Sequence, residues 1–178
     1  MAVSSRVVLI VAEEERTRAA FARCLAHEPH RVLAATRISE AFERMAAETV
    51  DLVVSDTLLP DGPGQALLRD VRHRYPDTMR ILLTPIAGLG TAVESMERGE
   101  IYRFLVKPWD DVELRGVVRG ALDRLIRERE NCRLLARVHR EIHQAISVAY
   151  PELHLIRDAT GSILLDDTEG DSVTLAVG

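Results

Sequence analysis

The chain has 178 residues, of which 47% are hydrophobic and 29% charged, and its formal net charge is −5. The composition is that of a globular protein, and the length fits one domain with an appendage. The net negative charge argues against a surface built for nucleic acid, and no apolar run approaches the roughly 20 residues that span a bilayer. The first residues lack a signal-peptide layout, and Cys24 and Cys132 fit no metal-binding spacing. We therefore expect a cytoplasmic protein with free thiols that binds neither membrane nor nucleic acid.

In chain order, a continuous β-branched apolar run at residues 7–11 predicts a strand buried on both faces of a parallel sheet. Segments with helical spacing and further short apolar runs then alternate. This alternation predicts an α/β fold with a doubly wound, five-stranded parallel sheet. The predicted strands cover residues 7–11, 32–35, 52–54, 81–83 and 104–106, and the predicted helices contain residues 19–25, 41–46, 67–71 and 92–96, with a fifth beginning near Asp110.

Among the 23 basic residues only Lys107 is a lysine. A compact ammonium suits a crowded pocket that holds a phosphoryl or carboxylate oxygen, whereas arginine offers a planar fork. The alternative is the chance survival of one lysine in a chain that otherwise uses arginine.

Four polar residues, Glu13, Asp56, Thr84 and Lys107, follow the ends of four predicted strands. In a doubly wound sheet the ligand crevice lies beyond these carboxyl ends, so the four side chains are expected to converge. Aspartate can act as a nucleophile towards phosphorus, and the remaining groups and a magnesium ion can neutralise phosphoryl oxygens. The alternatives are that Asp56 caps the turn at residues 60–64 and that Glu13 favours the start of a helix.

Together these motifs resemble the receiver domain of bacterial two-component response regulators. The match covers residues 6 to about 125 in the family order and at the family spacing. The resemblance implies a flavodoxin-like fold. The matching segments are residues 8–14, 56–64, 81–84 and 99–110.

The resemblance also implies roles for individual residues. Asp56 would be the phosphoacceptor for a sensor histidine kinase, and Thr84 and Lys107 would contact the phosphoryl group. Thr84 and Phe104 would be the switch residues, and the Lys107–Pro108 peptide bond is expected to be cis.

In the family, a magnesium ion would bind to Glu13, Asp56 and the backbone carbonyl of Leu58. Two departures affect this site. Ala12 and Glu13 replace the usual pair of acids, so the metal site is expected to be weak, shifted or absent, because magnesium demands near-ideal octahedral geometry. Pro85 replaces a small residue and is expected to stiffen the loop that follows Thr84.

Two functions follow from this resemblance. The first is a phosphorylated response regulator that signals through its C-terminal helix. The second is a degenerate receiver that works as a dimerisation or docking module without phosphorylation. An enzyme that uses Asp56 on a small substrate would need a covering cap, and no insertion is long enough, so we expect no enzymatic activity.

Beyond the receiver (residues 1–125) we expect a long helix (126–150) and a short β-rich tail (151–178). A heptad-like seam along this helix favours a homodimer, although a helix folded back on its own domain is the alternative. Its arginines alternate with acids, which is typical of a solvated face rather than of nucleic-acid binding, and no output partner can be read from the tail. Strands are expected at residues 153–157, 162–166 and 173–177.

Overall fold

The computed structural model describes residues 5–149, 154–157, 163–166 and 173–174. The chain divides into two compact units, Met1–Arg129 and Glu130–Gly178. The domain boundaries at residues 125 and 150 stay predictions.

The first unit is built on a five-stranded sheet in which all neighbouring strands are parallel. The strand order is β2-β1-β3-β6-β7, which confirms the predicted doubly wound fold. The central strand β3 is buried along its whole length, as its unbroken apolar start requires. The strands are β1 (Arg6–Val11), β2 (His30–Ala35), β3 (Leu52–Asp56), β6 (Met79–Thr84) and β7 (Arg103–Val106).

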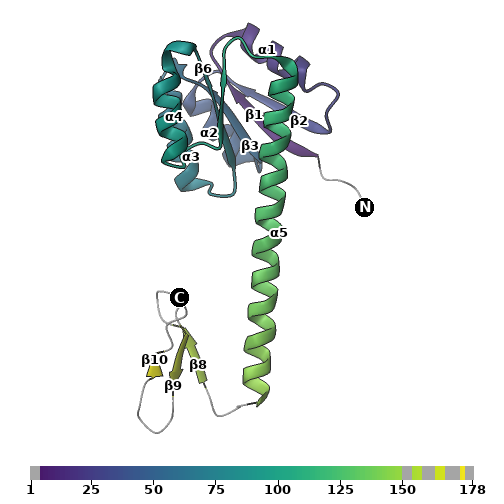
Figure 1. Ribbon diagram of the computed structural model, residues 1–178, viewed down its shortest axis with the longest axis vertical. Coiled ribbons are helices and arrows are strands. Elements are labelled where there is room, and N and C mark those ends of the chain that lie inside the picture. The colour runs from purple at the N-terminus through teal and green to yellow at the C-terminus, as the bar shows by residue number, and fades with distance from the viewer. Residues whose placement is uncertain (1–4, 150–153, 158–162, 167–172, 175–178) are drawn as a thin grey trace. The chain divides into compact units, whose positions relative to one another are not determined.

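Helices cover both faces of this sheet (Figure 1). Phe21 of α1 and Leu114 of α5 belong to one core cluster, while Met45 of α2 and Leu67 of α3 belong to the other. The sheet is therefore sealed on both faces, and its carboxyl edge is left for a ligand. The helices are α1 (Glu15–Cys24), α2 (Ile38–Ala47), α3 (Gly64–Arg74), the 3₁₀ helix η1 (Ile86–Gly88), α4 (Leu89–Glu97) and α5 (Asp111–Ala149).

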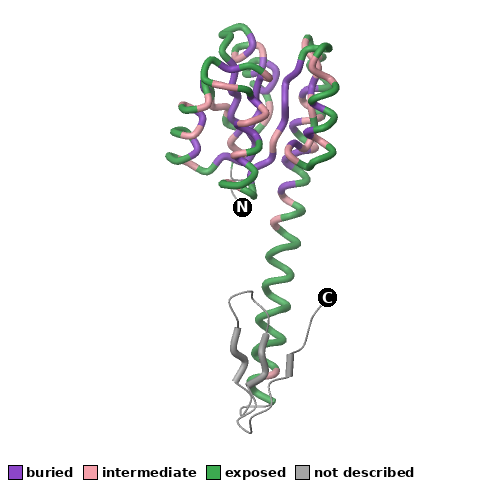
Figure 2. Tube along the Cα trace, turned by 90° about the vertical axis from the view of Figure 1, so that its left-hand side faces the viewer, coloured by how far each residue is buried: buried purple, intermediate pink, exposed green. Residues whose placement is uncertain are grey.

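The helix α5 begins where the sequence predicted, because the Asp110 carboxylate accepts the backbone N–H groups of Val112 at 2.8 Å and Glu113 at 3.1 Å. It continues for 39 residues. Its buried residues end at Leu125, and the turns beyond residue 129 are almost entirely exposed (Figure 2). No helix in the described ranges is both long and apolar enough to cross a bilayer.

One feature differs from the sequence prediction. A two-stranded hairpin, β4 (Leu58–Leu59) and β5 (Gly62–Pro63), forms within the turn that follows Asp56. The sequence predicted a turn at residues 60–64 and no strands beside it, because strands of two residues leave no periodic pattern.

The predicted strands of the tail are confirmed where the structure describes them. They form an antiparallel sheet in the order β10-β9-β8. Residues 153, 162 and 175–177, at the ends of the predicted strands, lie outside the described residues. The strands are β8 (His154–Arg157), β9 (Ile163–Asp166) and β10 (Val173–Thr174).

Candidate functional site

A pocket of about 320 Å³ opens at the carboxyl edge of the sheet. It combines three carboxylates with one ammonium group, and Thr57 and three apolar side chains form the rest of its wall. This is the edge at which doubly wound sheets bind ligands. The lining residues are Glu13, Glu14, Asp56, Thr57, Leu58, Leu83, Pro85 and Lys107.

Asp56 and Lys107 meet in this pocket. The Asp56 side chain is 9% exposed, and its Oδ1 forms an ion pair with the Lys107 ammonium. Burial raises the pKa of the Asp56 carboxyl above its ordinary value, Lys107 opposes this rise through its hydrogen bond and charge, and Glu14 adds to it. The Lys107 backbone N–H donates to the Thr84 carbonyl at 2.9 Å, and the Lys107–Pro108 peptide bond is cis as expected.

The acids after β1 line the pocket but do not enclose a metal site. Ala12 is fully buried in the core and offers no side-chain oxygen. Glu13 and Glu14 are both on the pocket wall, and Glu14 is the acid whose charge reaches Asp56. In the part of the chain that the structure describes, no three His, Cys, Asp or Glu side chains are grouped closely enough to hold a metal ion.

Arg18 of α1 fixes the turn that carries these acids. Its Nη1 donates to the backbone carbonyls of Ala12 and Glu13, each at 2.6 Å, and its Nη2 pairs with Glu15. The side chain is 15% exposed, so this guanidinium is an internal brace for the turn. Its position sets where the Glu13 backbone lies relative to the pocket.

Thr84 is fully buried but is not part of the pocket wall. Its hydroxyl donates to the Pro85 carbonyl at 3.1 Å, and the Gly88 N–H donates to the same carbonyl at 2.9 Å. Phe104 is half-buried against the core cluster that faces α2, α3 and α4. The structure therefore brings Asp56 and Lys107 together and directs the Thr84 hydroxyl elsewhere.

Three residues that sequence reasoning did not single out position Asp56. The Ser55 hydroxyl donates to the Asp56 carbonyl at 2.9 Å, and the Thr57 hydroxyl donates to the Leu83 carbonyl at 2.8 Å. Gly64 starts α3 against the same backbone, since a Cβ built there would lie 1.7 Å from the Asp56 carbonyl oxygen. Only the glycine left a signal in the sequence, at the end of the turn predicted at residues 60–64.

The fold and this pocket define a doubly wound α/β protein with a buried, lysine-paired aspartate at the ligand edge of its sheet. The family model of the response regulator receiver domain matches residues 8–119. The chain belongs to this family, which confirms the resemblance drawn from the sequence.

Relatives and solved structures agree with this assignment. The response regulator protein PilR of Pseudomonas aeruginosa is 33% identical over 120 residues, which are 67% of this chain and 27% of PilR. The regulatory protein AtoC of Escherichia coli is 27% identical over 96% of this chain and 34% of its own length. The crystal structure of the signal receiver domain of an HD domain-containing protein from Pseudomonas fluorescens is 35% identical, with a TM-score of 0.68, and the match covers 73% of this chain and 96% of that domain. The chain spans about a quarter to a third of the length of these two curated relatives.

Proposed function

We propose that this chain is a two-component response regulator whose receiver accepts a phosphoryl group on Asp56 from a sensor histidine kinase. The observation that carries the proposal is the ion pair of Asp56 with Lys107 in a pocket at the carboxyl edge of the sheet. The chain would act as a signalling module rather than as an enzyme, and its output would pass through α5.

In the proposed reaction, an Asp56 carboxylate oxygen attacks the phosphorus of a phosphohistidine on the kinase. The new O–P bond forms as the N–P bond breaks, and the released imidazole nitrogen takes a proton from water. Lys107 then leaves its pairing with the carboxylate for a phosphoryl oxygen, where its point charge balances the added negative charge. Because burial raises the pKa of Asp56, Lys107 also helps to keep the attacking carboxylate ionised.

A magnesium ion would be held here by Glu13, Asp56 and the backbone carbonyl of Leu58, and it would supply charge neutralisation on the phosphoryl oxygens. Glu14 is a further candidate ligand, since its charge already acts on Asp56. Magnesium usually keeps several waters and binds one or two carboxylates, so these residues can fit it without a closed cage.

The first test is phosphorylation by acetyl phosphate, read by intact mass spectrometry. Wild-type protein is expected to gain one phosphoryl group in the presence of magnesium, and Asp56→Asn none. Asp61→Asn is a matched control, because Asp61 belongs to the same loop but is not on the pocket wall. Failure of the wild-type protein to gain mass would contradict the proposal.

Ala12 favours a second candidate, a degenerate receiver that works as a dimerisation or docking module. Its methyl group is buried where the family has an acid, so this chain has one carboxylate fewer for a metal. Magnesium titration followed by Trp109 fluorescence separates the candidates, since Trp109 lies two residues from Lys107. Saturable quenching in wild-type protein that is lost in Glu13→Gln would favour the phosphorylated switch, and a flat titration would favour the degenerate receiver.

Both candidates include a homodimer through α5. Beyond Arg129 the described part of this helix carries several exposed large apolar side chains, and such a stripe is expected to pair with another helix. Among them, Leu135 is 70% and Ile142 is 55% exposed.

Size-exclusion chromatography with light scattering tests the dimer. The wild-type protein is expected to have the mass of two chains, and the double variant Leu135→Glu with Ile142→Glu the mass of one. Gln144→Glu adds a charge at another exposed position of the same helix and should leave the dimer intact. A wild-type monomer at high protein concentration would contradict the dimer but not the phosphorylation of Asp56.

A further inference from the structure

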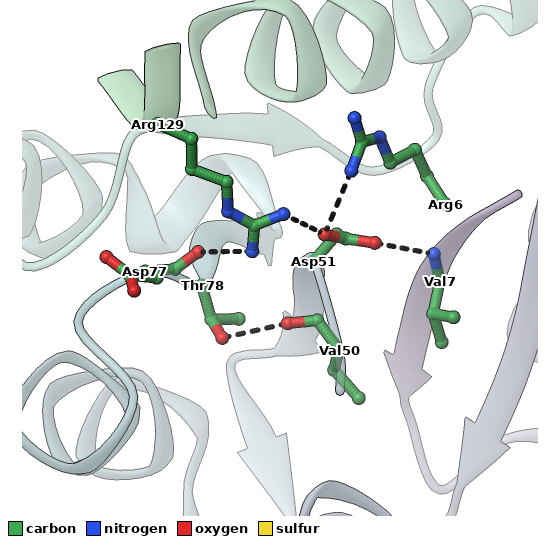
Figure 3. Close-up of polar contacts among 7 residues, drawn as sticks. All are labelled: Arg6, Val7, Val50, Asp51, Asp77, Thr78 and Arg129. Carbon is green, nitrogen blue, oxygen red and sulfur yellow. Dashed lines mark hydrogen bonds and ion pairs between the residues drawn. The ribbon is translucent and has the colours of Figure 1, made fainter. Parts of the chain in front are cut away.

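A second aspartate, Asp51, lies just before β3, at the end of that strand opposite to Asp56. Figure 3 shows the polar contacts around it. Its side chain is 8% exposed, and both of its oxygens are used. Oδ1 accepts from Arg129 Nη1 at 2.6 Å and has Arg6 Nη1 at 3.7 Å, while Oδ2 accepts the Val7 backbone N–H at 3.0 Å. An almost buried carboxylate therefore holds two cations, one of which comes from 78 residues further along the chain.

The Arg129 guanidinium reaches a second point on the receiver. Its Nη2 donates to the backbone carbonyl of Asp77 at 3.3 Å, in the loop that precedes β6. The starts of β3 and β6 are themselves joined, because the Met79 N–H donates to the Asp51 carbonyl at 2.9 Å. Two nitrogens of the planar Arg129 guanidinium thus bind at the starts of two adjacent strands, β3 and β6. The single ammonium of a lysine does not offer this forked geometry.

Arg129 occupies a particular place along α5. The last buried apolar residue of the helix is Leu125, and Arg129 follows one turn later on the same side. From residue 130 to residue 149, no described side chain of α5 is buried. Arg129 is also the last residue of the first compact unit.

We propose that Asp51 and Arg129 form the attachment that holds residues 126–129, the last turn of α5 that packs on the receiver, and so set the residue at which the signalling helix leaves the domain. Apolar packing alone would hold α5 on the receiver only as far as Leu125. With 8% and 26% of its two side chains exposed, the pair is shielded more than an ordinary surface ion pair. The attachment does not require phosphorylation of Asp56, so it goes beyond the function proposed above.

Hydrogen exchange on the full chain tests this proposal, because amides in a detached turn open without global unfolding. In Arg129→Ala, amides of residues 126–129 are expected to exchange at least about fivefold faster, as the loss of a partly buried pair requires. Those of residues 114–125 are expected to keep their wild-type rates. The matched control is Arg133→Ala, which removes an exposed arginine one turn further along α5 and should change neither segment.

A second variant, Asp51→Asn, keeps an oxygen for the Val7 N–H and removes the charge that Arg129 meets. It is expected to reproduce the exchange pattern of Arg129→Ala, and the double variant should add nothing to either single change. Unchanged exchange at residues 126–129 in Arg129→Ala would overturn the proposal. Independent, additive effects of the two substitutions, or acceleration that extends equally through residues 114–125, would overturn it as well. Because exchange is measured without a phosphoryl donor, the result can be read whether or not Asp56 is phosphorylated.

Discussion

Gly64 offers a sharp test of how α3 holds the site, because this helix begins in direct contact with the backbone of Asp56. A Cβ at residue 64 would lie 1.7 Å from the Asp56 carbonyl oxygen and 2.7 Å from the Ser55 hydroxyl. Real Cβ atoms essentially never come closer than 3.0 Å, so the backbones must separate by at least 1.3 Å. Neither side can yield by rotating a flexible side chain, since the nearest atom belongs to the main chain of a fully buried strand.

We expect Gly64→Ala to lower the free energy of unfolding by about 3 kcal/mol, the upper part of the range for overpacked sites. With a urea dependence of roughly 1–3 kcal/mol per molar, the midpoint of unfolding should fall by about 1–3 M. Binding of a phosphoryl mimic at Asp56 should weaken as well, because the displaced carbonyl belongs to the phosphoacceptor.

Gly116→Ala is the matched control. Gly116 lies inside α5 with nothing within 4 Å of an added Cβ, so alanine should stabilise the helix by roughly 0.5–1 kcal/mol. Urea unfolding of both variants, followed by circular dichroism, measures the difference. A Gly64→Ala midpoint at or above that of the wild type would refute the reasoning.

Three further predictions concern Asp56 itself and two loops near it. The Asp61 carboxylate accepts hydrogen bonds from the backbone N–H groups of Ile38 and Ser39 at the start of α2. Burial raises the pKa of Asp61, but these hydrogen bonds outweigh it and hold the pKa below its usual value. Asp61→Ala should therefore cost about 1 kcal/mol in urea unfolding at pH 7, and the difference should vanish as the pH falls through this lowered pKa. Burial raises the pKa of Asp56, so the free energy of unfolding of the wild type should fall as the pH rises through that pKa. Asp56→Asn should therefore have a higher urea midpoint than the wild type at pH 7 and lose this difference in acid. A lower midpoint for Asp56→Asn at pH 7 would contradict the prediction. An added Cβ at Gly88 would lie 2.4 Å from the Thr84 hydroxyl, so Gly88→Ala should break its hydrogen bond to Pro85. If Thr84 contacts the phosphoryl group, loss of this competing bond, worth about 1 kcal/mol, should tighten binding of beryllofluoride by roughly fivefold, as read from Trp109 fluorescence, and unchanged binding would argue against that contact.

The sheet was predictable because its strands have an unmistakable pattern. The β-branched run at residues 7–11 is apolar at every position, and this pattern is typical of a strand covered on both faces. The ligand edge followed from the strand order of such sheets, and the meeting of Asp56 with Lys107 followed from that edge. These inferences rest on periodicity and topology, which a sequence carries directly.

The details of the site depend on side-chain rotation and were not predictable in the same way. Nothing in the sequence indicates that the Thr84 hydroxyl bonds Pro85 or that Glu14, rather than Glu13, acts on the pKa of Asp56. The first outcome depends on the Thr84 rotamer. The second depends on the turn after β1, which Arg18 holds through hydrogen bonds to backbone carbonyls that leave no motif.

The aspartates at the two ends of β3 also show what the sequence can and cannot indicate. Asp56 was recognised because it follows an apolar run in a family motif, while Asp51, which precedes that run, was not singled out from the sequence. Its importance depends on Arg129, which is 78 residues away and was interpreted as one of many solvated arginines on a long helix. A charge on a helix can be assigned to solvent or to a partner only when the opposite charge is located in space. The arginines of α5 therefore need to be judged one at a time, and Arg129 is set apart from exposed neighbours such as Arg133 because a nearly buried carboxylate lies 2.6 Å from its guanidinium.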